Sequence, residues 1–90
     1  MDAKIYKAYY ESELVQENTT VFAKDCTCIS FELLGTSEAM LDKLIPVTDS
    51  KIREFNEEPY VTIDKNFSVT FDATDSDQRL LVTRTYYKEV

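Results

Sequence analysis

The chain has no histidine and a single glycine, and these absences narrow its chemistry before any motif is considered. Histidine is the usual general base and the usual activator of a nucleophilic serine or cysteine, so the common catalytic arrangements built on it are missing. One glycine cannot form a glycine-rich loop that holds phosphate. Carboxylates are abundant, but pairing them into an acid and a base depends on the fold. The sequence therefore favours a protein that is not an enzyme.

Long apolar runs are missing as well. No stretch of about 18 apolar residues is present, and the first residues lack the basic start and apolar centre of a signal peptide. We therefore expect no membrane span and an intracellular, cytoplasmic protein. A length of 90 residues, 43% of them apolar, predicts one domain covering residues 1–90.

Cysteine is scarce, and its two copies, Cys26 and Cys28, are separated by one residue. On a strand such residues lie about 6.5–7 Å apart, too far for an unstrained disulfide. A zinc site would need carboxylates or a second subunit to complete its ligands, and no Cys-x-x-Cys redox spacing is present. We therefore expect no metal or cofactor. The sequence favours two small, half-buried side chains, which predicts a helix or another subunit over that face of the strand.

The clearest pattern that is present is alternation of apolar and polar residues in the second half of the chain. It predicts strands at about 60–64 and 67–72, joined by a loop at 64–66 that sets Ile63 opposite Phe67. A third strand is expected at about 79–88, completing a β-meander. Either Leu80, Val82 and Tyr86 or Leu81 and Tyr87 could face the core, and the first set is favoured.

The middle of the chain has the spacing of short helices. A helix is predicted at about 37–45, capped by Thr36 or Ser37 and ended by Pro46. A second helix is predicted at about 50–56, with Ile52 and Phe55 on its inward flank.

The N-terminal third is ambiguous between strand and helix over residues 4–15, and strand is the preferred interpretation. A further strand at about 19–23 would form a hairpin with the cysteine strand through Lys24 and Asp25. On that strand, Thr27, Ile29, Phe31 and Leu33 share the predicted core face, and Cys26 and Cys28 share the other. The expected fold class is α+β: a small, mainly antiparallel sheet of four to five strands with one or two short helices.

The net charge of −7 argues against nucleic acid as a direct ligand and suggests a basic protein partner, although it can also serve solubility alone. Acidic loops and exposed tyrosines are the candidate contact groups. The candidate partner-binding residues are Glu54, Glu57, Glu58, Asp64, Asp72, Asp75, Asp77, Tyr60, Tyr86 and Tyr87. The aspartates are also ordinary turn residues, and the tyrosines can be ordinary residues of a sheet.

The predicted function is a non-enzymatic interaction module, an inhibitor or regulator of a basic, nucleic-acid-handling protein. Small acidic proteins of viral or mobile-element origin act in this way, and that comparison is an analogy. The alternative is a structural, assembly or decoration subunit of a larger particle. Such a subunit would form homo-oligomers through a sheet edge or a second apolar face.

Overall fold

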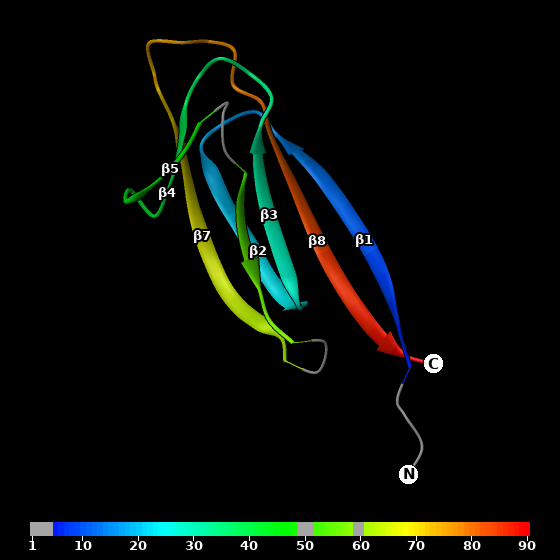
Figure 1. The fold of residues 1–90 in the computed structure, drawn as a ribbon. Coiled ribbons are helices and arrows are strands. Elements are labelled where there is room, and N and C mark those ends of the chain that lie inside the picture. Colours follow the sequence, from blue (N-terminus) through cyan, green and yellow to red (C-terminus); the bar gives the residue numbers. More distant parts are fainter. Residues whose placement is uncertain (1–4, 49–51, 59–60) are drawn as a thin grey trace.

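The computed structural model describes residues 5–48, 52–58 and 61–90, and all regular structure in these residues is β. The strands are β1 (Tyr6–Val15), β2 (Thr19–Cys26), β3 (Cys28–Leu33), β4 (Ala39–Leu41), β5 (Ile45–Val47), β6 (Arg53–Asn56), β7 (Ile63–Phe71) and β8 (Leu80–Glu89). They form two four-stranded antiparallel sheets, which we call sheet A (order β1-β8-β3-β6) and sheet B (order β2-β7-β4-β5) (Figure 1).

The core lies between the two sheets, because each strand turns one of its alternating sets of side chains toward the other sheet. Phe31 of sheet A meets Phe67 of sheet B with ring centroids 5.1 Å apart, and Phe55 lies 5.1 Å from the same ring. The buried apolar residues are Val15, Val21, Ala23, Cys26, Ile29, Phe31, Leu33, Ala39, Leu41, Val47, Phe67, Val69, Phe71, Leu80 and Val82.

Six of the connections between the described strands pass from one sheet to the other, and β4 and β5 are the only described strands that are consecutive in sequence and pair with each other. One of these crossings joins β2 to β3, where Asp25 adopts a left-handed φ of 58° and both Cys26 and Thr27 are buried. Another joins β7 to β8 through residues 72–79. There Gly35 packs so closely on the backbone of Asp77 that a Cβ would collide with its carbonyl oxygen.

The predicted α+β class is wrong, since the described residues contain no helix. The predicted helix at 37–45 is the hairpin of β4 and β5, whose turn places Asp42 and Lys43 in the left-handed region. Burial alternates along this segment: Ser37, Ala39 and Leu41 are buried and the residues between them are exposed. The sequence does not show this strand-like alternation, because two of the buried positions are occupied by a serine and an alanine instead of large apolar residues. Pairing of β4 with β7 overrides the local preference for helix.

The predicted helix at 50–56 is also wrong where the structure describes it. Residues 53–56 form β6, and residues 50 and 51 lie outside the described part. Phe55 does turn inward, but Ile52 is 58% exposed. Arg53 turns inward as well and donates from Nε to the carbonyl oxygen of Pro46 at 2.7 Å, which anchors β6 to β5.

The predicted β-meander is wrong in two respects. β7 runs without interruption through residues 64–66, so there is no hairpin loop, and β8 belongs to the other sheet. Lys65 explains the first error, because it occupies an inward position of a continuous strand and resembles a loop residue in the sequence. Its ammonium group reaches Asp42 at 2.8 Å and lies 4.9 Å from the Phe67 ring centroid.

Several other strand predictions are confirmed. The N-terminal segment is a strand, the segment from Thr19 is a strand, and Leu80 and Val82 face the core. The proposed hairpin between β2 and β3 is wrong, because β2 pairs with β7 and β3 with β8. Ile29, Phe31 and Leu33 do share the core face, but Cys26 is also buried, since the chain passes from one sheet to the other at that point.

Candidate protein-interaction surface

One face of sheet A points away from sheet B, and we call it the outer face of sheet A. Strand register assigns its residues: Tyr6, Ala8, Tyr10, Ser12 and Leu14 of β1, Leu81, Thr83, Thr85, Tyr87 and Glu89 of β8, Cys28, Ser30 and Glu32 of β3, and Glu54 and Asn56 of β6. Among the described residues, sheet B packs only on the opposite face (Figure 1). Of the two predicted covers for this face, a helix is wrong, since no described element forms one, and another subunit stays a prediction.

Side-chain contacts between neighbouring strands hold this face in one arrangement. Ser12 Oγ and Thr83 Oγ1 lie 3.1 Å apart and join β1 to β8. The Cys28 thiol donates to Glu54 across 3.6 Å and joins β3 to β6. Thr85 at the centre of the face is only 8% exposed, because its neighbours cover it. A preformed surface of this kind loses little conformational freedom when it binds.

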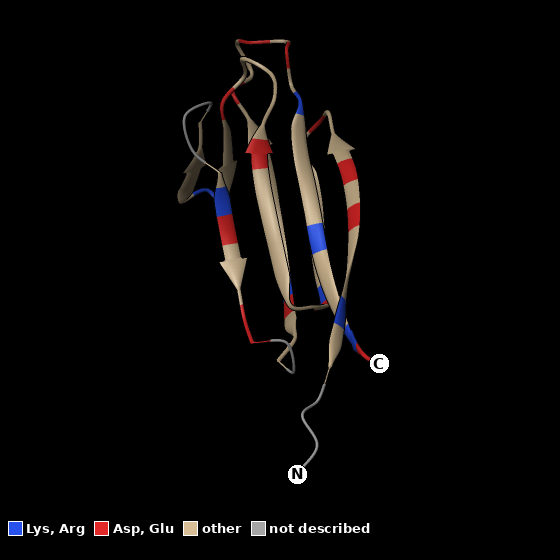
Figure 2. Cartoon of the chain, turned by 45° about the vertical axis from the view of Figure 1, so that its right-hand side comes forward, with Lys and Arg blue, Asp and Glu red and all other residues tan. Residues whose placement is uncertain are grey.

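The outer face of sheet A carries Glu32, Glu54 and Glu89 and no lysine or arginine. Figure 2 shows basic positions on the same strands, but their side chains belong to the other face. Arg84 points inward, and Lys7 and Lys88 are directly opposite each other on β1 and β8. The two faces of the sheet therefore differ in the sign of their charge.

Arg84 is the buried basic group beneath this surface. It is 7% exposed, and its Nε donates to the carbonyl oxygen of Phe22 at 2.8 Å, which ties sheet A to β2. Its Nη2 donates to Glu13 at 2.8 Å, and its Nη1 lies 3.7 Å from Glu11. Because both glutamates come from β1, this cluster holds the edge strand against the rest of the protein.

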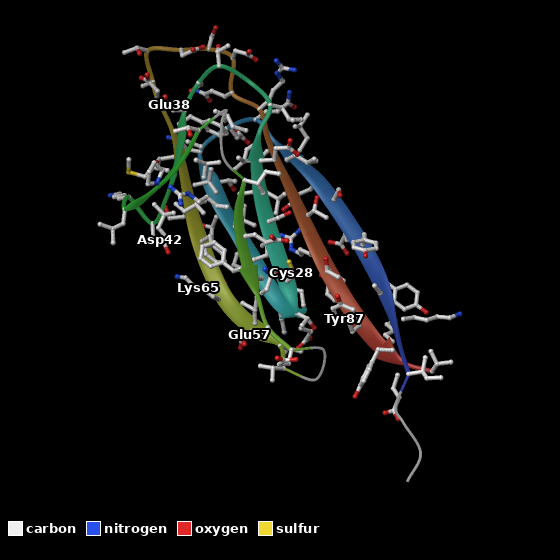
Figure 3. All side chains as sticks on the ribbon, in the orientation of Figure 1. Cys28, Glu38, Asp42, Glu57, Lys65 and Tyr87 are labelled. Atoms are coloured by element: carbon white, nitrogen blue, oxygen red, sulfur yellow. The ribbon has the colours of Figure 1, made fainter. Side chains whose placement is uncertain are left out.

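The two cysteines lie in different surroundings. Cys26 is fully buried between the sheets, and Cys28 is half-buried on the outer face of sheet A (Figure 3). Burial raises the pKa of both thiols, and the carboxylate of Glu54 raises the pKa of Cys28 further. Both groups therefore stay protonated at neutral pH, the less reactive form of a thiol.

The predicted acidic residues do not share one surface. Glu57, Glu58 and Asp64 lie at the end where β2 turns into β3, since Glu57 N donates to the Thr27 carbonyl and Asp64 is opposite Lys24. Asp72, Asp75 and Asp77 follow the other end of β7 (Figures 1 and 3). Of the predicted acids, Glu54 alone is on the outer face of sheet A.

The aspartates of residues 72–77 make local hydrogen bonds that shape the connection between β7 and β8. Asp72 accepts from the hydroxyl and the backbone N–H of Thr74, and Asp75 accepts from the N–H of Asp77. Asp77 binds Arg79 and the backbone N–H of Thr36. These bonds lower the pKa of Asp72 and Asp77. Asp72, Asp75 and Asp77 therefore have a clear structural role.

The predicted tyrosines, like the predicted acidic residues, do not share one surface. Tyr87 is on the outer face of sheet A, Tyr86 is partly buried against the core, and Tyr60 lies outside the described residues. Tyr6 and Tyr10 were not among the predicted contact residues, yet they join Tyr87 on this face. Because side chains alternate between the two faces of a strand, a strand over residues 6–14 would have placed Tyr6 and Tyr10 on the same side. That alternation could not have shown which side is left uncovered.

A shallow hollow of about 320 Å³ lies at the other side of the molecule, on sheet B. It is lined by Glu38, Ala39, Met40, Pro46, Thr70, Phe71 and Asp72. Its lining contains two carboxylates but no basic group and no thiol. We see no arrangement of catalytic groups there.

No protein-family model matches this chain, and neither a similar curated protein nor a similar solved structure was found. Within the described ranges, no group of three or more histidine, cysteine, aspartate or glutamate side chains is placed to hold a metal ion. The same ranges contain no helix long and apolar enough to cross a membrane.

Proposed function

We propose that this protein is a non-enzymatic interaction module that binds a basic protein through the outer face of sheet A. The observation that carries the proposal is an uncovered sheet face with Tyr6, Tyr10 and Tyr87, several glutamates and no basic side chain. Tyrosine is enriched at protein interfaces because its ring is apolar and its hydroxyl can still hydrogen-bond. The glutamates would select a partner of opposite charge.

The charge of the whole chain supports the same partner. A net charge of −7 attracts a basic protein over distances of about 10 Å and speeds its encounter. A basic protein that handles nucleic acid carries such a surface, and an acidic face laid over it would compete with phosphate groups. The proposed role is therefore inhibition or regulation of a protein of this kind, in the manner of small viral or mobile-element proteins.

A cytoplasmic location belongs to the same proposal, in the host cell if the protein is viral. Its support is the pair of free cysteines, a state maintained in reducing compartments. The alternative role, a self-associating structural subunit, is favoured by one separate observation. Strand β1 leaves a long sheet edge uncovered, and that edge is considered in the next subsection.

Affinity capture from the native host with three forms of the protein tests the proposed surface. The forms are the natural chain, the double variant Glu32→Lys/Glu54→Lys, and a control, Glu57→Lys/Asp64→Lys, with the same charge change at one end of the sandwich. We expect a basic protein to be retained by the natural chain and the control at low salt and lost with the double variant. Equal loss with both variants, or a captured protein without a basic surface, would contradict the proposal.

A further inference from the structure

The edges of the two sheets differ in how they are protected against pairing with another strand. β5 is three residues long and contains Pro46, and β6 is four residues long. The pairing of β2 with β7 shifts register between Lys24 and Cys26. Short edges, proline and bulges are devices that block strand addition. Each of these edges therefore has at least one such feature.

Strand β1 lacks all of them. It spans 10 residues, contains no proline, and pairs with β8 through consecutive residues without a register shift. No described element lies beyond it in Figure 1 or Figure 2. It is therefore the one edge among the described strands that is long, regular and open.

The hydrogen-bonding pattern between β1 and β8 shows which backbone groups of β1 have no partner in β8. Val90 N donates to the carbonyl oxygen of Ile5, and Leu34 N donates to that of Arg79. Because bonded positions alternate along an antiparallel pair, β1 bonds to β8 through its odd-numbered residues. The even-numbered residues turn their N–H and C=O groups outward, and they are Tyr6, Ala8, Tyr10, Ser12 and Leu14.

We propose that this edge pairs with a second copy of the same chain, in an antiparallel arrangement centred on Tyr10. A twofold axis at Tyr10 sets Tyr10 opposite Tyr10, Ala8 opposite Ser12, and Tyr6 opposite Leu14 of the second copy. This register uses every outward-facing residue of β1. Shifting it in either direction leaves at least one of them outside the paired region of the described strand.

Charge pairing agrees with this register. On the opposite face of β1, the twofold at Tyr10 sets Lys7 opposite Glu13 of the second copy, an attractive pair. Moving the axis to residue 11 would set Glu11 opposite itself, and moving it to residue 12 would set Glu11 opposite Glu13. Both of those arrangements are repulsive. An axis at residue 9 would set Lys7 opposite Glu11, which is also attractive, so that shift is excluded only by its smaller number of paired outward-facing residues. The fullest backbone pairing and a favourable charge pairing therefore coincide.

Pairing through β1 joins the two copies of sheet A into one continuous sheet. Its strand order is β6-β3-β8-β1 followed by the same strands of the second copy in reverse. The bonded residues share a face, so the two outer faces become a single surface with the Tyr10 pair at its centre. The pairing uses the backbone edge of β1, whereas the partner-binding face uses side chains of the same residues, and the pairing holds whether or not a basic partner exists.

Sedimentation velocity on the full chain tests the pairing, at concentrations up to about 100 µM, where an interface of micromolar affinity is filled. We expect twice the monomer mass of 10.4 kDa. Tyr10→Glu places two negative charges at the axis and should weaken association by roughly tenfold or more. Phe22→Glu is the control: Phe22 is also an exposed aromatic residue of an edge strand, and this change should leave the dimer intact.

Cysteine cross-linking tests the register, in a chain carrying Cys28→Ser so that the half-buried natural thiol does not interfere. Tyr10→Cys should form an intermolecular disulfide, because directly opposed Cα atoms lie about 5.5 Å apart. Ser12→Cys should not, because the two copies of residue 12 are separated by about 14 Å along the strands. If the chain stays monomeric, the proposal is overturned, and the edge of β1 is then open to some other extended segment. A dimer that survives Tyr10→Glu, or that cross-links equally at both positions, also overturns it.

Discussion

Replacing Arg84 with methionine should destabilise the protein substantially, because this side chain links three strands. The guanidinium donates to Phe22 of sheet B and to Glu13 of the edge strand, each at 2.8 Å, and its side chain is only 9% exposed. Methionine retains most of the buried aliphatic stem but none of the donors. The Phe22 carbonyl would then lose this partner, and the edge strand would lose its link to sheet B.

The magnitude follows from how exposed the partners are. Removing one member of a fully buried ion pair costs about 3–5 kcal/mol. Here the Glu13 side chain is 48% exposed and that of Glu11 is 65% exposed, so water can solvate both after the substitution. The expected cost is therefore smaller, about 2 kcal/mol, close to that of one hydrogen bond to a charged group. For a chain of this size it lowers Tm by roughly 10 °C.

Urea unfolding followed by tyrosine fluorescence measures this cost, since the chain has six tyrosines and no tryptophan. Glu13→Gln should destabilise less than Arg84→Met, and Glu11→Gln should have almost no effect because its contact with Arg84 is 3.7 Å long. If Arg84→Met left the free energy of unfolding unchanged or raised it, the cluster would not hold the edge strand, and the reasoning would be refuted.

Three further results are expected. Gly35→Ala should lower the free energy of unfolding by about 2–3 kcal/mol, because its Cβ would overlap the backbone of Asp77. Leu34→Ala, at the exposed neighbouring position, is the control and should cost much less. An unchanged urea midpoint for Gly35→Ala would show that the connection between β7 and β8 can shift freely. Acid should also weaken the fold, because hydrogen bonds from Lys65, Thr74 and Arg79 hold the pKa values of Asp42, Asp72 and Asp77 below their ordinary value of 3.8. A lowered folded-state pKa stabilises fully above about pH 4 and loses that effect as the pH falls through the folded value, so Asp42→Asn should flatten the loss measured by urea unfolding between about pH 4 and pH 2. Iodoacetamide should modify Cys28 slowly at pH 7 and faster as the pH rises past 9.0, while Cys26 should react only after unfolding; equal labelling of the two in the folded protein would contradict their different burial.

The parts of the fold that the sequence predicted are those in which apolar residues alternate without interruption. Ile29, Phe31 and Leu33 show this period plainly, and all three are core residues. The region after Gly35 has the same period, but Ser37 and Ala39 occupy its buried positions, so apolarity does not reveal it. Ser37 is buried because its hydroxyl donates to the carbonyl oxygen of Asp72, a partner 35 residues away. Local sequence carries no signal for such a contact.

Connectivity was predicted less well than the strands, for a related reason. The simplest connection between adjacent strands is a hairpin, but both β2–β3 and β7–β8 pass from one sheet to the other. Which strands pair then decides which side of each strand is exposed. The sequence indicated acidic and tyrosine contacts in general, and Glu54 and Tyr87 are on the outer face of sheet A. The contributions of Tyr6 and Tyr10 depend on the pairing of β1 with β8.

The position of β8 has a consequence for how the protein is made. This strand leaves the ribosome after the seven other described strands, yet it lies in the middle of sheet A, where it is the partner of β1 and one of the two partners of β3. Until it emerges, β1 has no strand to pair with, and its tyrosines and free backbone groups face water. Pairing between segments so distant in the chain is slow, typically milliseconds to seconds. A nascent chain that stalls before residue 80 therefore exposes the unpaired strand β1 and one open edge of β3, which is the state in which aggregation or chaperone capture takes place.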